Sequence, residues 1–148
     1  MVKKILCMFG LCGGLYVLLE LFFRGRSHVS MFFAGGLSAA CIFACCQYSR
    51  LRHACTFVKC IFGSAVITAV EFLTGAVVNL WLRLSVWDYS DMPMNVLGQI
   101  CLPFSLIWFV LTLPILKLGT LLCGKDDQLS DTASTKRATP DMPFSSGE

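Results

Sequence analysis

The chain has 148 residues, of which 56% are hydrophobic and only 14% are charged, and its formal net charge is +3. A soluble domain of this length needs many more charged residues to cover its surface, so the composition excludes an ordinary water-soluble fold. The small positive charge does not indicate a nucleic-acid partner either, because the basic residues flank apolar segments instead of gathering in one patch.

Four apolar windows follow one another along the chain. Each is about 20 residues long, the length that an α-helix needs to cross a hydrocarbon core of about 30 Å. Lipid offers no partner to an unpaired backbone group, so we expect all four to be helical spans. The first carries one charged residue, Glu20, the third carries Glu71, and the other two carry none. The predicted spans are residues 5–23, 29–48, 60–82 and 96–116.

Lysine and arginine are distributed unequally between the two sides of these spans. Nine would lie on the side of both termini and three on the other, and the side richer in basic residues is normally cytoplasmic. We therefore expect an all-α integral membrane protein of two helical hairpins, with both termini in the cytoplasm and the connection Trp87-Asp88-Tyr89-Ser90 facing outward. Residues 1–123 would form the four-span domain, and the polar residues 124–148 a disordered cytoplasmic tail.

The nine cysteines do not indicate a disulfide framework or a metal site. None lies in the two outward connections, where oxidation would occur, and no pair of C-x-x-C motifs is present. We expect neither a metal nor another cofactor. The segment from Gly119 to Asp126 is one residue from a nucleotide-binding P-loop, but Asp126 stands where Ser or Thr would hold magnesium, so any ATPase would be a separate protein.

The two glutamates within the spans are the strongest functional signal. A charged group at the centre of a span costs about 2.5–3.5 kcal/mol, so such residues usually face the bundle interior and are functional or paired. Each shares a helical face with other polar or small residues, and the fourth window has a third face of this kind. The faces are Tyr16, Glu20 and Arg24; Ser64, Thr68, Glu71, Gly75 and Asn79; and Asn95, Gly98, Cys101, Ser105, Trp108 and Thr112.

We expect these three faces to meet and to shield both glutamates from lipid. Arg24 lies four residues after Glu20 and can pair with it. Glu71 has no cation on its own helix, so it would be neutral or hydrogen-bonded to amides such as Asn79 or Gln99. We expect it to face the interior within reach of Asn79 or of the fourth span. Three interpretations remain open: the glutamates fasten helices together, they handle a ligand or a proton, or they contact an unseen partner subunit.

The polar connection between the third and fourth windows has two interpretations. Trp87 and Tyr89 suit the headgroup region, and Pro93 suits the start of a helix, so the connection could be an interfacial turn. It could instead form a lid over a polar, outward-facing cavity with Glu71 at its floor and Arg24 on its wall. In a lid, Asp88 or Asn95 would bond across to the first hairpin. The candidate pocket residues are Glu20, Arg24, Ser27, His28, Glu71, Asn79, Trp87, Asp88, Tyr89, Asn95 and Gln99.

These motifs carry a resemblance to a known family. The segments GGLYVLLELFFRGRSHVSMFFAGG, VEFLTGAVVN and VWDYSDMPMNVLGQICLPFSLIWF resemble the bacterial membrane family catalogued as "putative type IV ABC-transporter permease", over roughly residues 10–113. The resemblance implies a multi-span protein of the cell membrane that acts as a transporter subunit on a small or lipidic substrate. Its partners would be membrane lipid, a separate ATPase and further copies of the chain.

Two other functions are compatible with the same residues. The chain could be a binding or scaffold protein whose buried glutamates are structural. It could also be an enzyme acting on lipids, with Glu20, Glu71, Asp88 and His28 as acid–base groups. No nucleophile–base pair is evident in the sequence, so we do not expect an enzyme.

Overall fold

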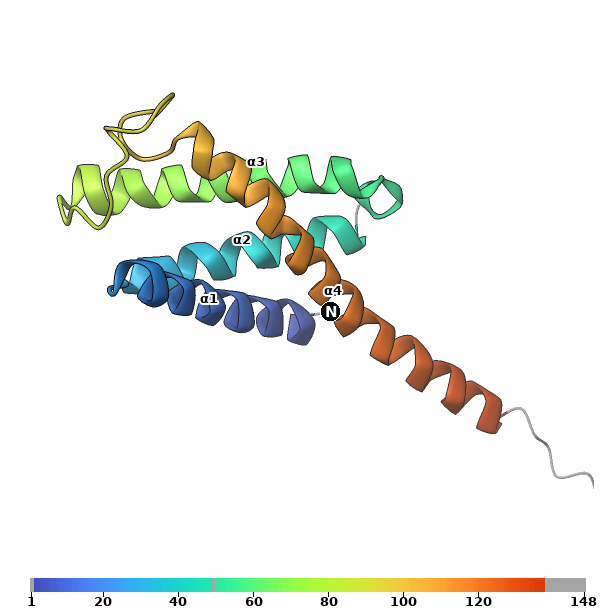
Figure 1. Ribbon diagram of the computed structural model, residues 1–148. Coiled ribbons are helices and arrows are strands. Elements are labelled where there is room, and N and C mark those ends of the chain that lie inside the picture. Colours follow the sequence, from blue (N-terminus) through green and yellow to red (C-terminus); the bar gives the residue numbers. More distant parts are fainter. Residues whose placement is uncertain (1, 49, 138–148) are drawn as a thin grey trace, which may run out of the picture.

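The computed structural model describes residues 2–48 and 50–137, and within them the chain is helical with no strand (Figure 1). Four helices are long and apolar enough to cross a membrane, which agrees with the predicted number of spans. A π-helical turn continues the third helix. The elements are α1 (Val2–Arg24), α2 (Val29–Tyr48), the short 3-10 helix η1 (Arg50–His53), α3 (Thr56–Gly75), the π-helix η2 (Ala76–Trp81) and α4 (Leu102–Arg137).

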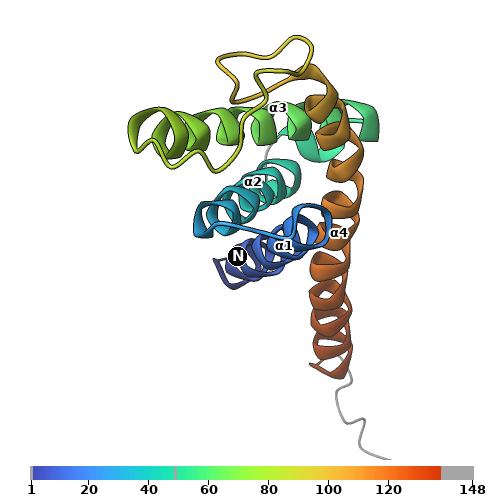
Figure 2. The same ribbon diagram turned by 60° about the vertical axis from the view of Figure 1, so that its left-hand side comes forward.

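The helices form a layer of three with the fourth crossing it. Helices α1, α2 and α3 run side by side, and α4 passes obliquely across them (Figures 1 and 2). The most extensive contacts are between α1 and α2 and between α3 and α4, while α2 also contacts α3 and α4. Each helix therefore has a face toward the interior of the group, and polar residues on those faces can meet away from lipid.

Local backbone signals set the ends of the first hairpin. Gly25 has a φ of +67°, which glycine adopts without strain, and its N–H bonds to the Leu21 carbonyl at 3.0 Å as α1 ends. In the first turn of α2, the Ser30 N–H donates to Nδ1 of the preceding His28 at 3.2 Å, and Ser30 Oγ lies 2.9 Å from the same nitrogen. His28 therefore caps the start of α2.

The start of the fourth helix differs from the prediction. We expected a helix from residue 96, but residues 96–101 are not helical and α4 begins at Leu102. Leu97 and Gly98 have φ values of +52° and +66°, which interrupt a helix. Pro103, and not Pro93, lies in the first turn, where a residue without an N–H is tolerated. Hydropathy alone did not reveal this boundary, because the residues before it are also apolar.

The far end of α4 also differs from the expected domain boundary. The helix continues through residues 124–137, where we expected the disordered tail to begin. No proline interrupts the chain between Pro114 and Arg137, so nothing in the sequence forces the helix to stop at Gly124. The rest of the predicted tail, residues 138–148, lies outside the described residues.

Candidate functional site

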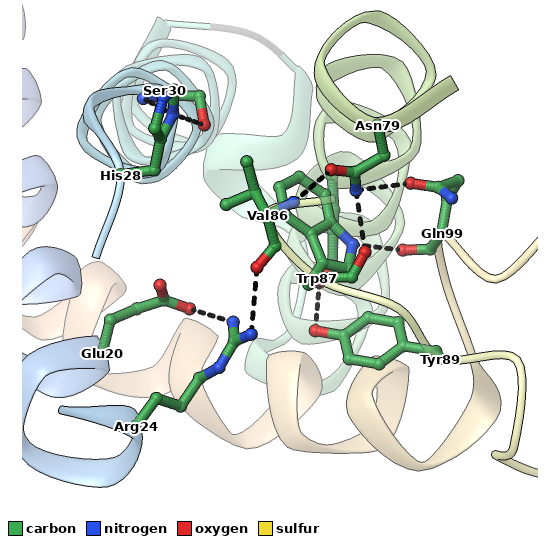
Figure 3. A network of polar contacts seen from close by, with 10 residues as sticks. Glu20, Arg24, His28, Ser30, Asn79, Val86, Trp87, Tyr89 and Gln99 are labelled. Carbon is green, nitrogen blue, oxygen red and sulfur yellow. Dashed lines mark hydrogen bonds and ion pairs between the residues drawn. The ribbon is translucent and has the colours of Figure 1, made fainter. Parts of the chain in front are cut away.

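The connection between η2 and α4, residues 82–101, folds back against α3 and is called the loop below. Asn79 lies at the centre of this contact (Figure 3). Its Nδ2 donates to the Trp87 carbonyl at 3.0 Å and to Gln99 Oε1 at 2.8 Å, and its Oδ1 accepts from the Val86 N–H at 2.7 Å. The Trp87 indole N–H donates to the Gln99 carbonyl at 3.0 Å. One side chain of η2 therefore organises both ends of the loop.

The loop packs tightly against the helix beneath it. Trp87 is 3% exposed and Gln99 is 4% exposed. A Cβ atom on Gly75 would lie 2.5 Å from Gln99 Oε1 and 3.0 Å from the Trp87 ring, so a larger residue here would displace these side chains of the loop. Irregular backbone at membrane depth is tolerated where protein buries it. The loop thus replaces the first turns of a longer fourth helix.

Glu71 is buried at 6% exposure and faces the interior, as predicted. Its Oε1 accepts a hydrogen bond from the Tyr89 hydroxyl at 3.0 Å, and its Oε2 accepts one from the Trp108 indole N–H at 2.7 Å. Asn79 and Gln99 do not bond to Glu71, because those two amides bond to each other and to the loop backbone. The expected approach of Glu71 to the fourth span is confirmed, since Trp108 belongs to α4. Glu71 therefore joins α3 to the loop and to α4 at one point.

The polar face of α3 below Glu71 lies against α4. Ser64 Oγ donates to the Ser105 carbonyl at 2.6 Å, and Thr68 Oγ1 donates to Ser105 Oγ at 3.2 Å. With Glu71, Gly75 and Asn79, these residues complete the face predicted from their spacing. The whole face is turned toward α4 and the loop.

Glu20 lies in a separate polar group. Arg24 Nη1 pairs with Glu20 Oε1 at 3.3 Å, which confirms the predicted ion pair, and Arg24 Nη2 donates to the Val86 carbonyl at 3.1 Å (Figure 3). Arg24 therefore links the end of α1 to the start of the loop. The polar bonds of Glu20 and those of Glu71 share no residue in the described chain.

Asp88 and Asn95 do not reach the first hairpin, so that prediction is wrong. The Ser90 N–H and hydroxyl both donate to Asp88 Oδ1, at 2.9 and 2.5 Å. These bonds lower the pKa of the exposed Asp88 carboxyl below its ordinary value. Asn95 Nδ2 donates to the Ser90 and Met92 carbonyls. Both side chains therefore stabilise the turn itself, as short polar residues commonly do.

The remaining candidates, His28, Ser27 and Tyr89, lie in different places, and of these only Tyr89 contacts Glu71. The His28 side chain contacts the N–H and hydroxyl of Ser30. The buried Ser27 hydroxyl has no hydrogen-bond partner among the described residues. Tyr89 is different, since burial and the neighbouring Glu71 carboxylate raise the pKa of its hydroxyl above the ordinary value. Tyr89 therefore keeps the proton that it donates to Glu71.

A cavity of about 160 Å³ lies beside Glu71, and it is lined by side chains of all four helices and by Trp87 of the loop. Its lining is mainly apolar, and Arg24 is not part of it, so the predicted polar cavity with Arg24 on its wall is wrong. Glu71 is in the wall, as expected. The other lining residues are Cys12, Leu15, Tyr16 and Leu19 of α1; Met31, Ala34, Gly35 and Ser38 of α2; Ile67 of α3; and Trp108, Leu111, Pro114, Ile115 and Leu118 of α4.

Comparison with known proteins places the chain in a family. The family described as "Putative ABC-transporter type IV" matches residues 4–133, a range that covers all but the first two residues of the four spans and contains every candidate residue named above. The chain belongs to this family. No curated protein and no solved structure matches the chain significantly. Family membership and the four apolar helices together establish a membrane protein related to ABC transporters.

Two residues of the site were missed as pocket residues in the sequence. Trp108 was recognised on a polar face of the fourth span, but not as the donor to Glu71. Tyr16 lines the cavity, with its ring centroid 5.9 Å from that of Trp108. The sequence did contain a signal for both residues, because Tyr16 shares a helical face with Glu20 and Trp108 shares one with Ser105. That spacing identifies a shared face but does not identify which helix the face meets.

Proposed function

We propose that the chain is the membrane-embedded subunit of a transporter and that its cavity binds a small or lipidic substrate. Membership of a family named for ABC transporters supports the transport role. A separate ATPase would supply the energy, because the P-loop-like segment of this chain has Asp126 where a Ser or Thr would hold magnesium. Four helices are few for a path across the membrane, so a second copy of the chain or a partner would complete it.

The cavity beside Glu71 is the observation that carries this proposal. Close packing normally leaves few voids larger than a water molecule in a protein interior. Here a pocket of about 160 Å³ lies among all four helices, and a buried carboxylate forms part of its wall. Pockets that bind small molecules combine such an apolar lining with a few placed polar groups. A purely structural Glu71 would need its two donors but no adjacent space.

We also propose that the cavity binds its ligand without catalysis. Each Glu71 oxygen already accepts a bond from a neutral donor, Tyr89 or Trp108, that positions the carboxylate. The serine in the lining is Ser38, and no histidine lies in the lining to activate it. We further propose, from the distribution of the basic residues, that both termini lie in the cytoplasm.

The binding proposal is tested by native mass spectrometry of the chain released from its own membranes. We expect one bound small molecule or lipid per chain in the wild type and its loss in Ala34→Phe, which fills the cavity. The matched control is Ala69→Phe, because Ala69 is exposed on α3 and does not line the cavity. A wild-type chain without a bound molecule, or equal retention by the Ala34 variant, would contradict the proposal.

A further inference from the structure

The Glu71 carboxylate has two hydrogen-bond donors, and no ion pair joins it to a cation among the described residues. The indole N–H of Trp108 can only donate, and the Tyr89 hydroxyl donates to the other oxygen, so both contacts are made by neutral groups. No Lys, Arg or His is among the residues that line the cavity. Arg24 is engaged with Glu20 and with the loop carbonyl of Val86. Hydrogen bonds orient a buried carboxylate, but they do not supply the opposite charge that stabilises it.

Three aromatic side chains lie in the wall of the cavity with this carboxylate. Tyr16 of α1, Trp87 of the loop and Trp108 of α4 all line the cavity with Glu71. The Tyr16 and Trp108 centroids are 5.9 Å apart, and their planes are inclined at 49°. The faces of such rings attract cations, and an organic ammonium group is the ligand that aromatic walls most often hold. The ring faces and the Glu71 carboxylate therefore both attract a positively charged group.

The size of the cavity limits the part of a ligand that it can enclose. A cavity of about 150 Å³ lined by apolar side chains holds a benzene molecule. The cavity here, at about 160 Å³, has room for one ring or a short alkyl group among residues such as Leu15, Leu111 and Ile115. An apolar group of that size next to an ammonium would match both the lining and Glu71.

We infer that the cavity selects a hydrophobic organic cation, with its ammonium group paired with Glu71 and its apolar group among the aromatic and aliphatic side chains. This inference rests on the proposed binding function and names the chemical class of the ligand. The cation would supply the charge that the described lining lacks. A neutral or anionic analogue of the same shape would fill the space but leave the carboxylate without a counter-ion.

The test uses three probes of similar shape and different charge: 2-phenylethylammonium, 2-phenylethanol and 3-phenylpropanoate. The full chain is placed in phosphatidylcholine nanodiscs, and binding is followed by tryptophan fluorescence. Trp87 and Trp108 line the cavity, whereas Trp81 is 78% exposed, so a Trp81→Phe background confines the signal to the cavity. Empty nanodiscs correct for partition of each probe into lipid.

We expect the ammonium to bind at least tenfold more tightly than the alcohol and the carboxylate to bind most weakly. Glu71→Gln should reduce ammonium binding at least tenfold and change alcohol binding less than twofold. Glu20→Gln is the matched control and should change neither, because Glu20 is paired with Arg24 and does not line the cavity.

Two results would overturn the inference in different ways. Equal binding of ammonium and alcohol to the wild type, or a preference for ammonium that persists in Glu71→Gln, removes the cation selectivity and leaves the cavity as a binding site. Binding of no probe, together with identical signals from the wild type and Ala34→Phe, would remove the binding function as well.

Discussion

The Trp108 indole N–H lies 2.7 Å from Glu71 Oε2, and this contact joins the middle of the third span to the fourth. The other carboxylate oxygen accepts from Tyr89, which belongs to the loop. One buried carboxylate thus holds two helices and the loop together beside a cavity. The same group can position these elements and present a charge to a ligand.

Replacement of Glu71 should separate hydrogen bonding from charge. Glu71→Gln keeps a carbonyl oxygen that can accept from Trp108, so we expect little loss of stability. Glu71→Leu leaves the buried indole N–H without an acceptor, which costs about 1–3 kcal/mol. Unfolding in mixed micelles with an increasing fraction of dodecyl sulfate measures both variants. Wild-type stability in Glu71→Leu would show that the contact with Trp108 does not form.

The crossing of α3 and α4 predicts a steric effect with a compensating change. A Cβ atom on Gly63 would collide with the side chain of Thr112, so Gly63→Ala should destabilise the fold by about 1–3 kcal/mol. Adding Thr112→Ala should recover most of that loss, because it removes the atoms in conflict. Gly10→Ala is the control, since a Cβ there meets nothing within 4 Å. Unfolding in the same mixed micelles measures the stability of each variant. A double variant no more stable than Gly63→Ala would refute this crossing of α3 and α4.

Asn79 and Gln99 should be energetically coupled. Their side chains bond at 2.8 Å, so a double-mutant cycle of Asn79→Ala and Gln99→Ala should show an interaction energy of about 0.5–3 kcal/mol. Asn79→Ala combined with Val58→Ala, at the opposite end of α3, should be additive within about 0.5 kcal/mol. An additive result for the first pair would mean that the loop is not held by Asn79 as described.

The formation of α helices in the apolar windows could be predicted because length and hydropathy determine which segments can cross a membrane. The polar face from Ser64 to Asn79 could also be predicted, because side chains three and four residues apart share a face. The start of α4 could not, since the choice between Pro93 and Pro103 depends on how the loop packs against Gly75.

The hydrogen-bond partners of several polar side chains also could not be predicted from the sequence. Asn79 was expected near Glu71, but the loop backbone offers the amide a carbonyl and an N–H, which satisfy its donor and acceptor together. Asp88 and Asn95 found partners within their own turn. Local spacing predicts the pair Glu20–Arg24 because both residues are on one helix. It cannot predict contacts that depend on the crossing of two helices.

Arg24 should control the mobility of the loop more than Glu20 does. Arg24→Gln removes the bond to the Val86 carbonyl, whereas Glu20→Gln leaves it in place. A contact of about 1 kcal/mol corresponds to about a fivefold change in an opening equilibrium. Amide hydrogen exchange of residues 82–91 should therefore be about fivefold faster in Arg24→Gln and nearly unchanged in Glu20→Gln. Equal acceleration in both variants would assign the effect to the ion pair instead.

The orientation of the chain can be measured in intact cells. In the proposed topology nine of the twelve basic residues would lie on the side of the termini, which predicts that the exposed Ser90 faces outward. A membrane-impermeant thiol reagent should label Ser90→Cys above the background of the native cysteines and should not label Ser130→Cys. Labelling of the Ser130 variant alone would reverse the orientation.

An experimental density map of the chain purified from its own membranes in nanodiscs tests the central claim most directly. Our account predicts density for a bound molecule in the cavity between Tyr16 and Trp108, reaching the Glu71 carboxylate, which still accepts the indole N–H. A map in which Glu71 faces lipid, or in which the chain's own side chains fill that space, would contradict the account.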